Sequence, residues 1–225
     1  MVRADERGAA VKVKEHPILF STEMVRAILD GRKTQTRRCV QPQPLRVWGS
    51  GVFSLAHPEY VSAHVQLPGQ REYVWLRCPY GKPGDRLWVR ESHTFADTDW
   101  ENWVEVHYRD GTISRRAVPL VAAEKVAQWI EDREVDGDGD NWRPSIHMPR
   151  WACRVVLDVT RVCIQSLHEI TLSDAIAEGF EAGPLDRPAS QFVRIWNEIN
   201  DKRQGCDWGS NPWVWVVEFQ KTVWP

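Results

Sequence analysis

Residues 28–38 of the chain read ILDGRKTQTRR, the end of an amphipathic helix followed at once by a basic segment. Apolar residues recur at helical spacing before the glycine, at Met24, Val25, Ile28 and Leu29. Gly31 suits the left-handed conformation that ends a helix. From Arg26 to Arg46 there are six basic residues and one acidic residue, a net charge of +5. This segment is therefore predicted to attract an anionic or electron-rich ligand.

The rest of the chain predicts more strands than helices. Runs of strand-forming residues predict strands at 17–20, 86–91, 103–108, 151–165 and 213–219. Helical spacing and capping residues predict helices at 122–132, 171–178 and 189–200. Because the helices interrupt the strands without regular alternation, the pattern predicts an α+β fold, a mixed β-barrel with peripheral helices.

The charge distribution predicts one domain that carries an insertion. Residues 1–16 are expected to form a flexible leader, so the predicted single domain covers residues 17–225. Residues 95–140 include 12 acidic and 5 basic residues, a net charge of −7. Apolar residues are sparse there, so we expect an acidic insertion on the barrel with no core of its own. Its DGDGD sequence at 136–140 is expected to be a solvated loop.

The composition excludes several classes of protein. Hydrophobic residues make up 42% of the chain, which suffices for a buried core. No apolar run approaches the ~20 residues of a membrane span and no signal peptide is seen, so we expect a cytoplasmic protein without membrane contact. The net charge of −2 argues against binding through many phosphates. The five cysteines lack metal-binding spacing and predict free thiols: Cys39, Cys78, Cys153, Cys163 and Cys206.

Residues 31–38 resemble the hallmark of the ASCH family, a helix end followed by G-x-K-T-x-T-x-R. Three further stretches resemble, in the same order, the longer ASCH proteins of bacteriophage and prophage genomes. They are PGDRLWVRE at 83–91, PSIHMPRW at 144–151 and ITLSDAIAEGF at 170–180. The resemblance spans residues 17–219, apart from much of the acidic segment, and implies a PUA-like β-barrel.

ASCH domains include RNA binders, readers of modified bases, nucleases and small amidohydrolases. The motif here is most similar to that of N(4)-acetylcytidine amidohydrolases, which remove an acyl group from the exocyclic amine of cytidine. This similarity carries catalytic roles to Lys33 and Thr36 through K-T-x-T-x-R, and to Glu178 through a helix that ends A-x-x-E. It implies no metal ion and no cofactor, and it implies substrate contacts from Arg32, Arg37 and Arg38.

These residues cover the roles that hydrolysis of an N-acyl cytosine requires. Thr36 offers a hydroxyl nucleophile, and Lys33 can deprotonate it if burial and nearby arginines pull the pKa of Lys33 well below ~10.4. Glu178 can carry a proton to the leaving nitrogen, and Arg38 can hold the oxyanion. On a regular strand Lys33 and Thr36 point to opposite faces, so this chemistry requires irregular backbone at residues 32–36.

Two other functions use the same basic residues. A reader domain would bind RNA or a modified base without catalysis, and a ribonuclease would need no acyl-binding space. The slight net acidity favours a small nucleoside over a polymer, and the Lys-Thr-Glu set favours catalysis. We therefore expect a monomer that acts on a nucleoside, with RNA as the alternative partner. Trp48, Trp75 and Trp208 are candidates to stack on a base.

Overall fold

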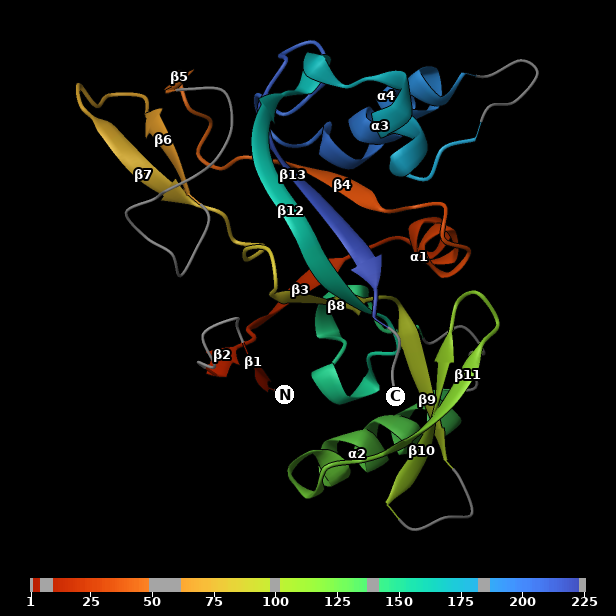
Figure 1. Ribbon diagram of the computed structural model, residues 1–225. Helices are drawn as coiled ribbons and strands as arrows, with labels where there is room; N and C mark the ends of the chain where they lie inside the picture. The colour runs from red at the N-terminus through yellow and green to blue at the C-terminus, as the bar shows by residue number, and fades with distance from the viewer. Residues whose placement is uncertain are drawn as a thin grey trace. The chain divides into compact units, whose positions relative to one another are not determined.

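The computed structural model describes residues 2–4, 10–48, 62–97, 102–136, 142–181 and 187–222. Helices and strands are mixed along the chain, which confirms the predicted α+β class (Figure 1). The chain divides into two compact units. Unit 1 comprises Met1–His16, Ala27–Leu87 and Leu157–Pro225, and unit 2 comprises Pro17–Arg26 and Trp88–Val156. No helix in the described ranges has the length and apolar character to cross a membrane.

Most elements belong to unit 1. They are β1 (Val2–Ala4), β2 (Ala10–Lys12), β4 (Gln35–Cys39), β5 (Arg46–Val47), β6 (Ser62–Gln66), β7 (Tyr73–Arg77), the 3-10 helix η3 (Leu167–Glu169), α3 (Leu172–Ala177), α4 (Pro188–Asn200) and β13 (Trp213–Lys221). Four elements have residues in both units: β3 (Glu15–Leu19), α1 (Thr22–Leu29), β8 (Arg86–Arg90) and β12 (Val156–Ser166). The remaining elements are β9 (His93–Asp97), β10 (Trp103–Tyr108), β11 (Ile113–Ala117), α2 (Leu120–Asp136), η1 (Ser145–His147) and η2 (Arg150–Ala152).

In the main sheet β13 is an inner strand, paired antiparallel with β12 on one side and with the edge strand β4 on the other. The strand order is β3-β8-β12-β13-β4. Residues Val214–Val217 of β13 are all buried, as expected for an inner strand that is covered on both faces. The outer strands of this sheet are β3 and β4, so among the described residues it is open and no closed barrel is seen.

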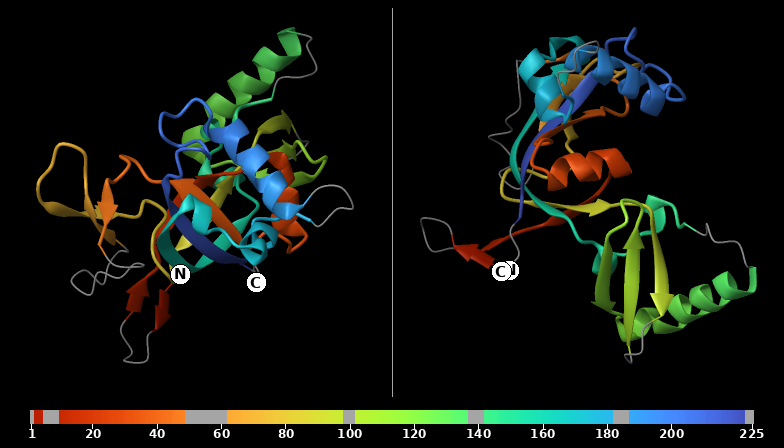
Figure 2. Two further views of the ribbon diagram at one scale, coloured as in Figure 1. Left: turned by 90° about the horizontal axis from the view of Figure 1, so that it is seen from above. Right: turned by 90° about the vertical axis from the view of Figure 1, so that its right-hand side faces the viewer.

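The helices α3 and α4 of unit 1 contact each other, and α3 also contacts β4 of this sheet (Figures 1 and 2). The capping box predicted at the start of α3 is confirmed, because Thr171 accepts from the Asp174 N–H and Asp174 accepts from the Thr171 N–H. The helix predicted at 189–200 has apolar residues at helical spacing, of which Phe192 and Trp196 are buried in α4 and Ile199 is exposed. Both helices therefore follow local sequence signals, with one of these apolar residues left in solvent.

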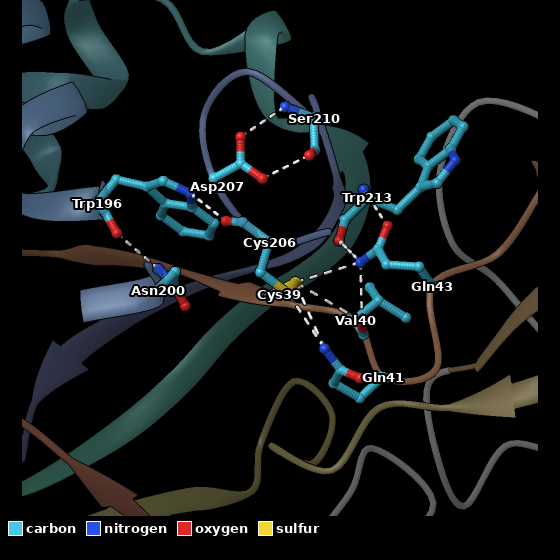
Figure 3. Close-up of a disulfide and its surroundings, with 10 residues drawn as sticks. All are labelled: Cys39, Val40, Gln41, Gln43, Trp196, Asn200, Cys206, Asp207, Ser210 and Trp213. Atoms are coloured by element: carbon cyan, nitrogen blue, oxygen red, sulfur yellow. Dashed lines mark hydrogen bonds between the residues drawn. A yellow bond between two sulfur atoms is a disulfide. The ribbon is translucent and has the colours of Figure 1, made fainter. Parts of the chain in front are cut away.

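A disulfide in unit 1 corrects the prediction that all cysteines are free thiols. Cys39 at the end of β4 is bonded to Cys206 in the loop after α4, with a Cα–Cα distance of 6.1 Å (Figure 3). The Nε2 atoms of Gln41 and Gln43 lie 3.1 Å from the Cys206 sulfur and 3.3 Å from the Cys39 sulfur, respectively. The prediction failed because 167 residues separate the pair and no local motif marks it. Cys78, Cys153 and Cys163 are free and buried.

Unit 2 contains a three-stranded antiparallel sheet, β11-β10-β9, with α2 across one face (Figure 2, right). Its buried core includes Phe95, Val104, Val106, Tyr108 and Val126. The acidic segment 95–140, expected to have no core of its own, supplies most of this core and shares it with Met148 and Ala152. In β10 the buried Val104, Val106 and Tyr108 alternate with more exposed residues such as Glu105, and Arg115 of β11 is exposed, so these charges lie on the solvent side. The DGDGD loop lies mostly outside the described residues.

Residues near the N-terminus are in contact with the rest of unit 1. The strands β1 and β2 pair antiparallel, from Val2 opposite Lys12 to Ala4 opposite Ala10. Further along, the Lys14 N–H donates to Asp85, and Nε2 of His16 lies 3.6 Å from the same carboxylate. Asp85 is buried and follows Pro83-Gly84, so this turn holds residues 14–16 in place.

Candidate functional site

The backbone that carries Lys33 is irregular up to Thr34, but the regular strand β4 begins at Gln35, so only part of the segment 32–36 has the irregular backbone that the catalytic interpretation required. Gly31 has a φ of 78°, the left-handed conformation predicted for it. The Arg32 and Lys33 N–H groups both donate to the Ala27 carbonyl at 2.9 Å. Lys33 then forms an isolated bridge with Glu178. The end of α1 therefore turns the chain so that Lys33 faces the end of α3.

Lys33 and Glu178 form a buried ion pair. The Lys33 Nζ donates to Glu178 Oε2 at 2.6 Å and to the Glu178 carbonyl oxygen at 2.9 Å. The side chains are 0% and 5% exposed, respectively. The structure thus brings together two of the three residues that the resemblance singled out, although 145 positions separate them in the chain.

Arg37 extends this pair into a cluster of four charged groups. Its guanidinium lies 3.5 Å from Glu178 Oε1 and 3.1 Å from Asp174 Oδ2, and it also contacts Gln35. With Lys33 and Arg37 as cations and Asp174 and Glu178 as anions, the formal charges balance. Asp174 was predicted only as a capping residue, because nothing in the local sequence indicates that a residue 137 positions earlier reaches it.

Burial shifts the proton affinities in this region. Desolvation lowers the pKa of Lys33 below its ordinary value, and the adjacent Glu178 carboxylate opposes the shift without reversing it. Burial also lowers the pKa of the Arg38 guanidinium, which nonetheless stays charged. For Asp174, burial is outweighed by hydrogen bonds from Thr171 and by Arg37, so its pKa lies below its ordinary value. The direction for Lys33 is the one that a general base requires.

The other predicted site residues lie apart from this cluster or at its edge. Thr36 is buried within β4 opposite Val217. Strand alternation places it on the face opposite Gln35 and Arg37, so the irregular backbone ends before it. Arg32 is exposed and pairs with Asp30 and Glu181.

Arg38 lies on β4, and its pKa is lowered by burial and also by the nearby charge of Arg203, a residue that lines a pocket. Arg38 is half-buried on the same face of β4 as Thr36, and its pKa is influenced by Tyr80, Glu178 and Arg203. Arg203 lines a pocket of about 420 Å³ together with Gln41 and Gln204. Sequence reasoning missed these lining residues, because they come from the β4 end and the loop after α4, which the disulfide joins.

The close approach of Glu178 to Lys33 depends on Gly179. A Cβ added to Gly179 would lie 3.0 Å from the Ala27 Cβ and 3.1 Å from the Lys33 Cβ, and Gly179 has a φ of 98°. We expect Gly179→Ala to lower the free energy of unfolding by more than the ~1–3 kcal/mol of left-handed strain alone. Gly31→Ala is the matched control, because φ is 78° there but nothing lies within 4 Å. Urea denaturation of both variants tests this, and equal losses would show that the contact is not tight.

Within the described ranges, no group of three or more histidine, cysteine, aspartate or glutamate residues could hold a metal ion. Comparison of the chain with known protein families, curated proteins and solved structures finds no match. The likeness to ASCH proteins therefore rests on the sequence motifs alone.

Proposed function

We propose that the chain removes the acyl group from N(4)-acylated cytosine or cytidine, as a PUA-like domain of the ASCH type. The observation that carries this proposal is the 2.6 Å contact between Lys33 Nζ and Glu178 Oε2 in a site closed to solvent. The two residues were singled out from motifs far apart in the sequence. Their contact supports a shared role, since independent surface residues would have no reason to meet in the interior.

In this proposal the reaction adds water across the amide bond and releases cytidine and a carboxylic acid. A proton first moves from Lys33 to Glu178 within the pair, and the lowered pKa of Lys33 favours that transfer. Neutral Lys33 then takes a proton from the attacking group, and Glu178 gives the transferred proton to the leaving N4 amine. Arg38 stabilises the oxyanion. Arg32 and Arg37 contact the substrate less directly, because both already pair with carboxylates.

A small nucleoside suits the charge of the chain, and a pocket of suitable size lies elsewhere in unit 1. The net charge of the chain is −2, which disfavours a polymer that is bound through many phosphates. The pocket lined by Gln41, Arg203 and Gln204 has a volume of about 420 Å³, within the range of small-molecule sites, and Lys33, Arg38 and Glu178 are not among its lining residues. The proposed substrate is therefore a free base or nucleoside.

The role of Thr36 is the least supported by the geometry, and it has its own test. If its hydroxyl attacks the acyl carbon, Thr36→Ala is expected to lower kcat/KM for N(4)-acetylcytidine by about 100-fold or more. Thr36→Ser, which keeps the hydroxyl, should retain most activity. Full activity in Thr36→Ala would remove the nucleophile role and leave a water molecule activated by Lys33 as the attacking group.

A second candidate function is binding of a modified base without catalysis. The observation that favours it is the balanced cluster of Lys33, Arg37, Asp174 and Glu178, whose charges are paired before any ligand arrives. Such a cluster can simply hold α3 against β4. A base bound without turnover, and with equal affinity in Glu178→Gln, would favour this candidate.

A further inference from the structure

The small sheet β5-β6-β7 carries aromatic residues on one face. Its register pairs His64 with Trp75, and Gln66 with Tyr73 and Arg46. The Trp48 N–H donates to the His64 carbonyl, which continues the ladder past β5. Cross-strand partners share a face of a sheet, and so do residues two apart in a strand. Trp48, His64, Tyr73 and Trp75 therefore lie together; this set is called the aromatic face below.

The four rings are packed against one another and remain accessible. The His64 and Trp75 rings are stacked, with centroids 4.7 Å apart and planes 18° apart. Tyr73 contacts His64 at 5.2 Å and Trp48 at 5.7 Å. Trp48 is 69% exposed and Trp75 is 47% exposed. Their contacts hold the rings in place while large parts of the two indole groups face solvent.

The core of unit 1 does not require these aromatic residues. The buried apolar side chains of the same sheet, Ala63 and Val65 at 4% and 0% exposure, lie on the opposite face, whereas on the aromatic face the small polar Ser62 is buried opposite Arg77. The solvent face of an antiparallel sheet is ordinarily polar. Contiguous exposed aromatic residues are instead typical of a binding surface.

Arginines lie at both ends of the aromatic face. Arg46 is the cross-strand partner of Gln66, which pairs in turn with Tyr73. Arg77 lies two residues beyond Trp75 on the same side of β7. The described part of this sheet, residues 46–48 and 62–77, includes three arginines and one glutamate, a local net charge of +2. A ligand that suits this surface has flat apolar rings joined by negative groups.

We propose that the aromatic face binds single-stranded nucleic acid, with bases stacked on Trp48 and Trp75 and phosphates near Arg46 and Arg77. Sheet surfaces that bind single strands use this combination of stacking rings and positive charge. A duplex hides the faces of its bases and suits the surface less well. This inference is independent of the proposed hydrolysis, because the aromatic face shares no residue with the Lys33 site.

The test is the affinity of the full chain for a labelled octamer of uridine, measured by fluorescence anisotropy at ~50 mM salt. We expect Trp48→Ala and Trp75→Ala each to weaken binding by about 5- to 150-fold, the effect of losing one base–aromatic stack. Trp48→Phe, which keeps a ring, should remain within about threefold of the unmodified chain. Arg46→Gln and Arg77→Gln should each reduce the log-log salt slope by about 0.7.

Trp103→Ala is the control, because this tryptophan is 39% exposed on β10 of unit 2. It is expected to bind as the unmodified chain does. A uridine octamer that does not bind, or tryptophan variants that bind normally, would overturn the proposal. So would a duplex or a proline-rich peptide that binds more tightly than the octamer.

Discussion

Lys33→Met is expected to lower the free energy of unfolding by about 3–5 kcal/mol, because it leaves the Glu178 carboxylate buried without its main partner. The Glu178 side chain is only 5% exposed, so water cannot replace the lost ammonium group. Glu178→Leu should lower the free energy of unfolding by a similar amount, because it leaves the Lys33 ammonium group buried without its carboxylate partner. The double variant Lys33→Met/Glu178→Leu should recover at least half of the loss, since two apolar side chains can replace a buried ion pair at little cost.

Urea denaturation of the three variants measures these differences. The matched control is Arg194→Ala, which breaks the ion pair with Glu198 on α4, where both side chains are more than half exposed. That variant should change stability by no more than about 0.5 kcal/mol. A single substitution at Lys33 or Glu178 that costs less than about 1 kcal/mol would contradict the buried pair.

Reduction of the Cys39–Cys206 disulfide is expected to lower the free energy of unfolding by an amount comparable to the loss of the Lys33–Glu178 pair. The bond joins residues 167 positions apart, and the chain-entropy model assigns about 5 kcal/mol to closing so long a loop. Measured values are often smaller, so a loss of about 2–5 kcal/mol is expected. The measurement is denaturation of the unmodified chain with and without a dithiol reductant.

The control is the variant with both Cys39→Ser and Cys206→Ser, treated with the same reductant. Without reductant this double variant should already have the lower free energy of unfolding of the reduced chain, and the reductant should not lower it further. The remaining thiols do not complicate the comparison, because burial raises the pKa of Cys78 to about 12 and also raises that of Cys153 and Cys163. Alkylation of the unreduced, denatured chain should label only the three free cysteines. Labelling of two additional thiols, those of Cys39 and Cys206, would contradict the disulfide.

Elements with local signals were predicted well. The capping box of α3, the apolar stripe of α4, the run of valines in β13 and the glycine stop after α1 each depend on a few neighbouring residues. By contrast, β4 reads QTRRC and has almost no strand character. It is a buried strand because β13 pairs with it and because α3 supplies carboxylates to Arg37. Such an element follows from tertiary contacts alone.

The residues of the candidate site also fall into those with a local sequence signal and those that depend on long-range contacts. The motif around Lys33 and the helix end at Glu178 were visible as separate local patterns, and their contact was suggested only through a resemblance. Asp174, the disulfide and the pocket residues Arg203 and Gln204 depend on long-range pairing, so the sequence did not indicate them. The sheet β5-β6-β7 was also missed, although two of its tryptophans had been noted.

The most direct test of the proposed function is release of cytidine from N(4)-acetylcytidine by the purified chain. The account predicts steady formation of cytidine and acetate, lost by about 100-fold or more in Glu178→Gln. It also predicts a change in kcat/KM of less than about threefold between ~50 and ~200 mM salt, because a neutral nucleoside makes no phosphate contacts. The absence of any cytidine release would contradict the account, most clearly if N(4)-acetylcytidine binds with the same affinity to the unmodified chain and to Glu178→Gln.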